Sequence, residues 1–144
     1  MKRILFVCMG NTCRSPMAQG LMNQYAHTHN LDIQATSAGI AVTEGMPMAG
    51  NALEVLEELK IDMTYHHARQ LCDADISNAN LIFCMAESHL AAVAAIFPKS
   101  MDKLRLVGKG IADPFGGDVE LYRNCREHIR AALPEIAEMA GRSV

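Results

Sequence analysis

V-C-M-G-N-T-C-R-S-P-M, residues 7–17, is the stretch that decides the fold of this chain. It continues an apolar run, residues 4–7, of the kind found in a short buried strand. Ser15 can cap the N-terminus of a helix, with Pro16 in the first helical turn, where its missing N–H leaves no partner unsatisfied. Gly10 lies between them, where the backbone must bend or approach a ligand closely. The stretch therefore predicts a strand, a compact loop and a helix in immediate succession.

A loop in this position predicts an anion site. Between a strand and a helix, several backbone N–H groups and the positive end of the helix dipole point at one place. Cys8 begins the loop and Arg14 ends it, so a thiol and a guanidinium face the same anion. The N–H groups, the guanidinium and the helix N-terminus together favour the thiolate form of Cys8.

The chemistry that fits these residues is transfer of a phosphoryl group. A thiolate beneath a bound phosphate can attack phosphorus in line, and Arg14 can bind two phosphate oxygens and stabilise the charge of the transition state. Ser15 can donate a hydrogen bond to the Cys8 sulfur, which makes it a better leaving group in a second step. A lone cysteine with apolar neighbours is usually a structural residue. The complete spacing C-x5-R-S-P at a strand-to-helix turn favours catalysis instead.

The same stretch resembles the active-site signature of the low-molecular-weight protein tyrosine phosphatases. Four further stretches of that family recur in order, S-A-G at 37–39, H-A-R-Q at 67–70, C-M-A-E-S at 84–88 and D-P-F at 113–115. The resemblance covers residues 1–144 as one phosphatase domain. It implies a cysteinyl-phosphate intermediate, no metal or other cofactor, a phosphorylated protein as substrate and phosphate as product.

The resemblance also implies roles for single residues. Cys8 would be the nucleophile, Arg14 the phosphate clamp and Asp113 the general acid. Asn11 would hold the loop in shape through hydrogen bonds that include Ser37 and His66. The residues expected to bind the substrate are the loop residues and one aromatic, namely Met9, Gly10, Asn11, Thr12, Cys13, Ser15 and Phe115.

Asp113 also has a plainer interpretation. Asp before Pro is common in turns, and the following Gly116-Gly117 indicates a turn as well. Combined with the cysteine loop, the pair favours the catalytic role, because Pro114 restricts Asp113 to an extended conformation that helps to aim its carboxyl group. That carboxyl would protonate the leaving group and then accept a proton from water. It must be protonated when the substrate binds, so we expect an acid-leaning pH optimum.

Two features differ from the pattern of the tyrosine-specific members. Thr12 stands where those members usually have a bulky aliphatic residue, and Phe115-Gly116-Gly117 stands where many carry two aromatics. Both features are similar to the bacterial protein arginine phosphatases of the family. Thr12 places a small polar group beside the phosphate pocket, which favours a guanidinium over a flat phenol ring. We expect phosphoarginine to be preferred, with phosphotyrosine close behind. Phe115 would be the one aromatic wall, unless Tyr122 adds a second instead of packing in the last helix.

Cys13 carries a separate hypothesis. It lies five residues after Cys8 in the same loop, so a reversible Cys8–Cys13 disulfide could protect the nucleophile from overoxidation. The alternative is a small residue that packs the loop.

Two functions of other classes are weighed against the phosphatase. A thioredoxin-coupled arsenate reductase uses a similar loop but needs two further redox cysteines, for which Cys72 and Cys84 are the candidates, and Cys84 lies in an apolar, strand-like run. A non-enzymatic phosphate-binding module needs no nucleophile. A nucleotide-binding P-loop is excluded because G-K-[ST] is missing.

The composition indicates a single reduced domain. A chain of 144 residues, half of them hydrophobic, can bury a core, and a net charge of −3 gives no reason to expect nucleic acid or membrane partners. Five irregularly spaced cysteines favour a cytoplasmic protein, and the N-terminal apolar run is too short for a signal peptide. The adjacent His66 and His67 point in different directions, which argues against a metal site. We expect a monomer or weak oligomer.

Strand-like and helix-like segments alternate along the chain. We expect strands at residues 2–8, 32–38, 81–85 and 103–107, and helices at 16–29, 51–60, 72–78, 87–97 and 118–140. Gly141 should end the last helix, and Pro134 should kink or split it. The order predicts an α/β fold, a single doubly wound domain with a four-stranded parallel sheet and helices on both faces. Ligands bind at the carboxyl ends of such strands, where Cys8 and the Asp113 loop fall.

Overall fold

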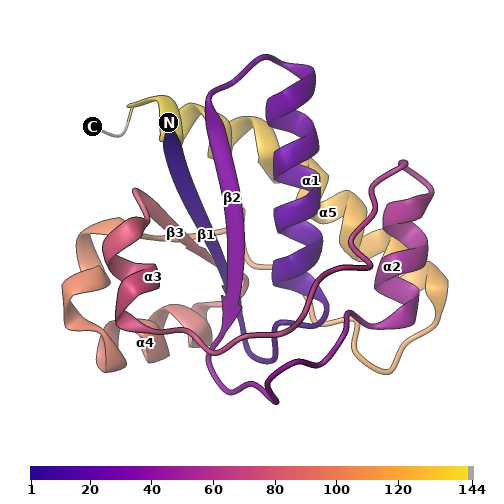
Figure 1. Ribbon diagram of the computed structural model, residues 1–144, viewed down its shortest axis with the longest axis horizontal. Helices are drawn as coiled ribbons and strands as arrows, with labels where there is room; N and C mark the ends of the chain where they lie inside the picture. The colour runs from indigo at the N-terminus through magenta and orange to yellow at the C-terminus, as the bar shows by residue number, and fades with distance from the viewer. Residues whose placement is uncertain (143–144) are drawn as a thin grey trace.

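Four parallel strands form one sheet in the order β2-β1-β3-β4 in the computed structural model, which describes residues 1–142 (Figure 1). The strands are β1 (Lys2–Cys8), β2 (Ile33–Gly39), β3 (Leu81–Cys84) and β4 (Leu104–Leu106). Cys8 pairs with Gly39, and Val7 pairs with Cys84. The carboxyl ends of the three longer strands therefore meet at the same edge of the sheet, and the predicted α/β fold is confirmed.

Helices cover both faces of this sheet (Figure 1). Three of them lie on one face, α1 (Arg14–Thr28), α2 (Gly50–Glu57) and α5 (Val119–Arg142). The other face carries α3 (Asp73–Asn78) and α4 (Glu87–Ile96), followed by a 3₁₀ helix, η1 (Pro98–Lys103). This is the doubly wound arrangement that the alternating segments predict.

The core has two layers because side chains of a strand alternate between the faces of the sheet. Ile4 and Phe6 belong to the larger layer beneath α1, α2 and α5, and Leu5 and Val7 belong to the smaller layer beneath α3 and α4. Cys8 continues the alternation into the larger layer and is 3% exposed. The nucleophile candidate is thus fixed by the same packing that holds β1.

Besides shifts in the ends of several elements, the structure differs from the predicted elements at three places. Lys103 belongs to the 3₁₀ helix rather than to a strand, because Pro98 starts a new helical turn there. Pro134 does not split α5, whose neighbouring side chains Leu133 and Ile136 are buried and hold the helix in place. Gly141 lies inside α5 and is not among the residues with positive φ, so it does not form the left-handed cap that was expected.

The outer edge of β2 is covered by a side chain of α1. Asn23 Nδ2 donates to the Ala35 carbonyl oxygen at 3.1 Å, and the Ala35 N–H donates to Asn23 Oδ1 at 2.8 Å. The amide of Asn23 therefore makes the two hydrogen bonds that a residue of a neighbouring strand would make.

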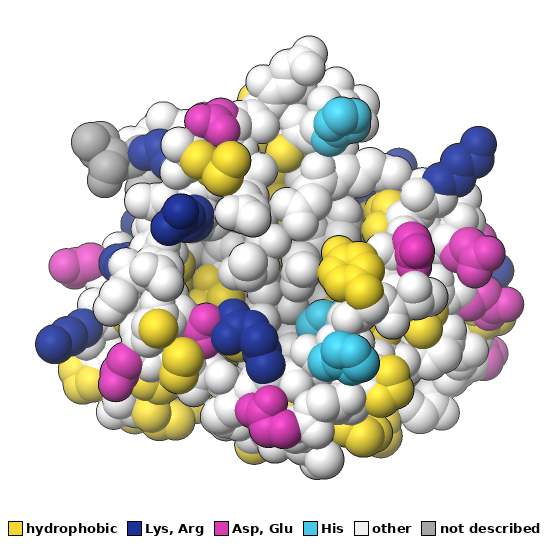
Figure 2. All heavy atoms as spheres, in the orientation of Figure 1, with side chains coloured by type: hydrophobic (Ala, Val, Ile, Leu, Met, Phe, Trp, Pro, Cys, Tyr) yellow, Lys and Arg dark blue, Asp and Glu magenta, His cyan; other side chains and the backbone are white. Residues whose placement is uncertain are grey.

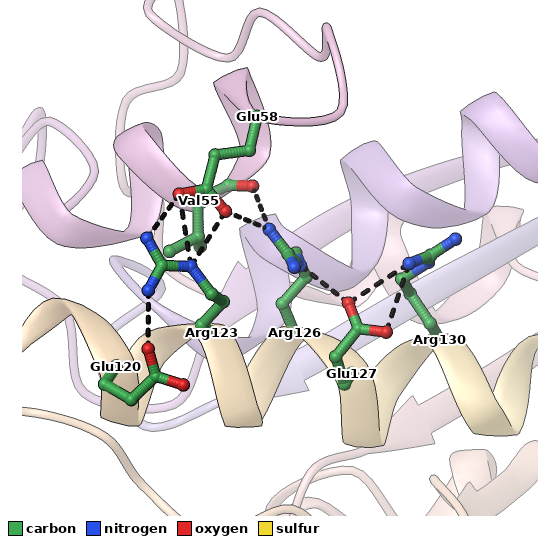
Figure 3. A network of polar contacts seen from close by, with 7 residues as sticks. All are labelled: Val55, Glu58, Glu120, Arg123, Arg126, Glu127 and Arg130. Carbon is green, nitrogen blue, oxygen red and sulfur yellow. Dashed lines mark hydrogen bonds and ion pairs between the residues drawn. The ribbon is translucent and has the colours of Figure 1, made fainter.

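Helix α2 is fixed to α5 by a network of ion pairs (Figure 3). Glu58, just after α2, pairs with Arg123 at 2.5 Å and with Arg126 at 2.6 Å. Arg126, which is 8% exposed, also donates to the Val55 carbonyl at 2.8 Å and pairs with Glu127. Arg126 donates to a backbone carbonyl of the last turn of α2. The network therefore fixes the end of that helix in addition to pairing the charge of Glu58.

On the face that carries β2, basic and acidic side chains are interspersed over much of the surface, and several acidic side chains lie close together beside α2 (Figure 2). Among residues 1–142, no helix combines the length and the apolar character needed to cross a membrane.

Candidate active site

The loop between β1 and α1, residues 8–14, forms the base of the site and is called the nucleophile loop below. Helix α1 begins at Arg14, with Cys13 as its N-cap, two residues earlier than predicted. Ser15 therefore does not cap the helix, and the expectation that it would was wrong. It lies inside the first turn, where its hydroxyl oxygen is 2.9 Å from the Cys8 sulfur.

The hydrogen bond between Ser15 and Cys8 is part of a small network with Asn11. Asn11 Nδ2 donates to Ser15 Oγ at 2.8 Å. Because Ser15 Oγ accepts this bond, its own proton is free to point at the sulfur of Cys8. The predicted contact between Ser15 and the Cys8 sulfur is present, and a hydroxyl that donates to the sulfur stabilises a thiolate.

Asn11 holds the nucleophile loop in place from its centre. Its backbone is in the left-handed region, with φ at 59°, and the residue is fully buried. Its Oδ1 accepts from the Arg69 N–H at 3.1 Å, and its carbonyl oxygen lies 2.9 Å from His66 Nε2. Burial lowers the pKa of His66, so the imidazole is neutral and donates through Nε2. Asn is among the few residues whose backbone enters this region readily. The backbone conformation of Asn11 and its hydrogen bonds therefore both hold the nucleophile loop in shape.

Ser37 makes no hydrogen bond to Asn11, which corrects one predicted support of the loop. Its hydroxyl donates to Gln19 Oε1 at 2.6 Å, away from the nucleophile loop. The neighbouring Gly39 is the residue of β2 that approaches the loop, because a Cβ there would lie 2.8 Å from the Met9 carbonyl and 3.0 Å from Asn11 Cβ. Ser37 therefore packs beside α1, and the close approach is made by the glycine.

Arg14 links the nucleophile loop to the loop that carries Asp113. Its Nη1 donates to the Ile111 carbonyl at 2.9 Å, and its Nη2 lies 3.6 Å from Asp113 Oδ2. The Arg14 side chain is 8% exposed, whereas the Asp113 side chain is 54% exposed. The guanidinium is thus fixed in the wall of the site, and the carboxyl lies at its opening.

The segment from Asp113 to Asp118, called the acid loop below, contains two consecutive turns. The Phe115 N–H donates to Asp113 Oδ1 at 3.0 Å, and the Gly117 N–H donates to the Pro114 carbonyl at 2.9 Å. Gly116 supplies the positive φ, 81°, at the third position of the second turn. The ring of Phe115 is left 77% exposed beside the carboxyl group.

Most of the predicted site residues share one cavity of about 200 Å³. Its wall consists of the whole nucleophile loop and two residues of the acid loop, namely Cys8, Met9, Gly10, Asn11, Thr12, Cys13, Arg14, Asp113 and Phe115. Ser15 lies behind Cys8, and His66 behind Asn11, so both support the wall from outside. Within residues 1–142, no three His, Cys, Asp or Glu side chains are grouped to hold a metal ion.

The other cysteines differ from Cys8 in their surroundings. Tyr122 is buried and contacts Cys13, with its hydroxyl 3.4 Å from the sulfur, so it packs against the nucleophile loop and forms no second aromatic wall. Burial raises the pKa of Cys13. Burial also raises the pKa of Cys84 and of Cys125 to about 12, so both remain thiols. A Cys8–Cys13 disulfide stays a prediction, since both residues are free cysteines here.

Sequence reasoning missed the contacts that hold the two loops at a fixed separation. The Ala49 N–H donates to the Thr12 carbonyl at 3.0 Å, and Asn51 Nδ2 donates to the Gly117 carbonyl at 3.2 Å. The Ile111 carbonyl that binds Arg14 was also missed. These contacts join segments far apart in the sequence through backbone atoms, so no side-chain motif marks them.

Comparison with known proteins places this geometry in a family. The sequence profile of the low molecular weight phosphotyrosine protein phosphatases matches residues 3–144. The chain is 36% identical to a protein-arginine-phosphatase of Geobacillus stearothermophilus and 31% identical to the low molecular weight protein-tyrosine-phosphatase Wzb of Escherichia coli. These matches cover 94% of both chains in the first case, and 96% of this chain and 90% of Wzb in the second.

A solved structure of the YwlE arginine phosphatase, in a mutant with a phosphorylated active site serine, superposes with a TM-score of 0.92. It is 29% identical to this chain, and the match covers 97% of this chain and 96% of that one. The chain described here therefore belongs to the low molecular weight phosphotyrosine protein phosphatase family.

Proposed function

We propose that this protein removes phosphate from phosphorylated arginine residues of proteins through a covalent cysteinyl phosphate. The observation that carries the proposal is the convergence of three groups on one cavity. The Cys8 sulfur can accept a hydrogen bond from the Ser15 hydroxyl, Arg14 is fixed in the wall, and Asp113 Oδ2 lies 3.6 Å from that guanidinium at the opening. A nucleophile, an anion clamp and an acid therefore face a single bound phosphate.

In the first step, the Cys8 thiolate attacks phosphorus and the bond from phosphorus to the leaving nitrogen breaks. Asp113 gives its proton to that nitrogen, so arginine leaves with its normal protonation. The backbone N–H groups of the nucleophile loop and Arg14 stabilise the charge on the phosphate oxygens. The products of this step are the cysteinyl phosphate, the free arginine side chain and an ionised Asp113.

In the second step, water attacks the phosphorus of the cysteinyl phosphate. Asp113 accepts a proton from that water, and the bond from phosphorus to sulfur breaks. The Ser15 hydroxyl stabilises the departing thiolate at 2.9 Å. Phosphate leaves, and both Cys8 and Asp113 return to their starting protonation states. Replacement of the active site cysteine by serine in YwlE gives a phosphorylated serine, which supports attack from this position of the loop.

The preference for arginine rests on Thr12 and the acid loop. Thr12 lines the cavity beside the phosphate site and presents a hydroxyl that can accept a hydrogen bond from a guanidinium N–H. Phe115 is the one aromatic in the cavity wall, followed by two glycines. A phenol ring has no N–H to donate to Thr12. It also gains less contact from a single aromatic wall than from the two aromatics that many tyrosine-specific members carry. Relatives named protein-arginine-phosphatase match at 36% and 30% identity, which supports the same direction.

A comparison of two peptides tests this preference. The peptides share one sequence and carry either phosphoarginine or phosphotyrosine, and kcat/KM is measured for each, with Cys8→Ser as the blank. We expect phosphoarginine to be preferred, and we expect Thr12→Ile to reduce that preference by about tenfold, the worth of one hydrogen bond to a charged group. Thr28→Ile, at the far end of α1, is the matched control.

Three outcomes are informative. A phosphotyrosine preference in the parent protein would reject the arginine assignment and leave a tyrosine phosphatase. An unchanged preference in Thr12→Ile would remove Thr12 from the explanation. Absence of Cys8-dependent turnover of either peptide would reject the phosphatase itself. The arsenate reductase alternative has no support, since the relatives cited are named phosphatases and Cys84 is a fully buried thiol.

A further inference from the structure

The internal contacts of the acid loop fix its shape but not its position. The turn from Asp113 to Phe115 and the turn from Pro114 to Gly117 involve only residues of the loop itself. The Asp113 and Phe115 side chains are mostly exposed, at 54% and 77%. The position of the carboxyl group relative to Cys8 therefore depends on contacts at the two ends of the loop.

The preceding end is fixed from the sheet side. The Ile111 N–H donates to the Met85 carbonyl at 2.7 Å, and the Ile111 carbonyl accepts from Arg14 at 2.9 Å. At the other end of the loop, Asp118 caps α5 by accepting from the Leu121 N–H at 2.9 Å. Gly117 lies against α5 so closely that a Cβ there would approach Leu121 Cδ2 to 2.3 Å.

A side chain of α2 also reaches the far end of the loop. Asn51, the second residue of α2, donates from Nδ2 to the Gly117 carbonyl at 3.2 Å. Two residues earlier, the Ala49 N–H donates to the Thr12 carbonyl in the nucleophile loop at 3.0 Å. The segment 49–51 thus contacts both loops, and the other end of α2 is fixed to α5 through Glu58 (Figure 3).

The two oxygens of Asp113 have different partners, which makes the position of the loop important. Oδ1 accepts the Phe115 N–H, and since a carbonyl oxygen is a better acceptor than a protonated one, this bond favours the proton on Oδ2. Oδ2 faces Arg14 at 3.6 Å. The proton for the leaving group is therefore carried on Oδ2, and a displacement of the loop moves this oxygen relative to the phosphate. Proton transfer needs the two heavy atoms within about 3 Å, so a small displacement matters.

We propose that Asn51 is a positioning residue for the general acid, holding Oδ2 of Asp113 over the leaving group by fixing the Gly117 carbonyl. Asn51 touches no reacting atom itself. The inference rests on the proposed function, in which Asp113 protonates the leaving group. It adds a residue of α2, 62 positions away from the acid, to the machinery that sets the rate of leaving-group protonation.

The experiment uses a series of aryl phosphates whose phenols range from strongly acidic to weakly acidic. Acidic phenols leave without a proton, whereas phenol itself needs one, so the dependence of kcat/KM on phenol acidity reports the general acid. In Asn51→Ala we expect kcat/KM for phenyl phosphate to fall about five- to tenfold, the worth of one hydrogen bond, and to change less than twofold for the most acidic phenol. Alanine is a strong helix former, so α2 should remain folded.

Two control variants make the result decisive. Glu54→Ala, at an exposed position of the same helix, should leave both rates unchanged. Asp113→Ala should give the same leaving-group dependence in a stronger form, about 10²- to 10⁴-fold for phenyl phosphate. If Asp113→Ala shows no such dependence, the proposed general acid is wrong. If it does and Asn51→Ala lowers all substrates equally, or none, the role of Asn51 is rejected while the proposed function stands.

Discussion

The nucleophile loop and the acid loop form one cavity but are built in opposite ways. The nucleophile loop is mostly buried, with Asn11 fully enclosed and Met9 exposed, and it is held by contacts from residues that follow β2, from His66 and from Ala49. The acid loop is largely exposed, contains two turns of its own, and is reached by one side chain from α2. One half of the cavity is rigid by construction, and the other is held at its ends.

The proposed function, in which one loop stabilises charge and the other supplies a proton, accounts for this difference. Charge stabilisation works best when the donors are fixed before the reaction, because no energy is then spent on orienting them. The acid must instead meet a leaving group that belongs to a protein substrate and has to enter past it. A loop anchored at its ends leaves that entrance open and still returns the carboxyl group to one place.

The largest effect is expected where the two loops meet. Arg14→Lys keeps the positive charge but loses the flat fork that binds two phosphate oxygens and also the bond to the Ile111 carbonyl. We expect kcat/KM to fall about 10²- to 10³-fold. Arg130→Lys, at an exposed position of α5, is the matched control. Retention of more than a tenth of the activity in Arg14→Lys would mean that charge alone is sufficient in this half of the cavity.

A smaller effect tests the rigidity of the nucleophile loop. Asn11→Gly keeps the left-handed backbone but loses the side-chain bonds to Ser15 and Arg69, and we expect about 2 kcal/mol of lost stability. Asn11→Ala loses the same bonds and adds about 1 kcal/mol for its backbone conformation. Urea unfolding of both variants measures the two contributions. Equal stabilities for the two would show that the loop relaxes out of the left-handed conformation, contrary to a rigid nucleophile loop.

The smallest effect concerns the helix that supports the acid loop. The Arg123 and Arg126 guanidinium groups lower the pKa of Glu58 to about 2 from the ordinary 4.5. The unfolded chain therefore binds the proton first as the pH falls. The stabilising contribution of Glu58 is complete above about pH 4.5 and is lost as the pH falls towards 2. We expect Glu58→Gln to be less stable than the parent at pH 7 and the difference to shrink below pH 4.5, as followed by thermal unfolding. A difference independent of pH would assign the effect to packing.

The sequence allowed the prediction of the parts that local rules determine. Cys8 and the loop around it follow from an apolar strand that ends in a turn, and parallel strands bring the loop before α5 to the same edge. The contact of Ser15 with the Cys8 sulfur was predicted, but its place inside the first turn of α1 was not, because Cys13 takes the N-cap position. Asn51 and Ile111 were not recognisable for another reason. Each of the two bonds joins a side chain to a backbone carbonyl, and packing alone decides which side chain reaches that carbonyl.

The hydrogen bonds of Asn23 affect how this protein can associate with other protein chains. It occupies both hydrogen-bonding groups of Ala35 on the outer edge of β2. An exposed edge strand invites a strand of another chain to extend the sheet, which is a common beginning of aggregation. Here an incoming strand would find the N–H and the carbonyl of Ala35 already bonded to Asn23. A single asparagine of α1 thus helps to keep the sheet at four strands at high protein concentration.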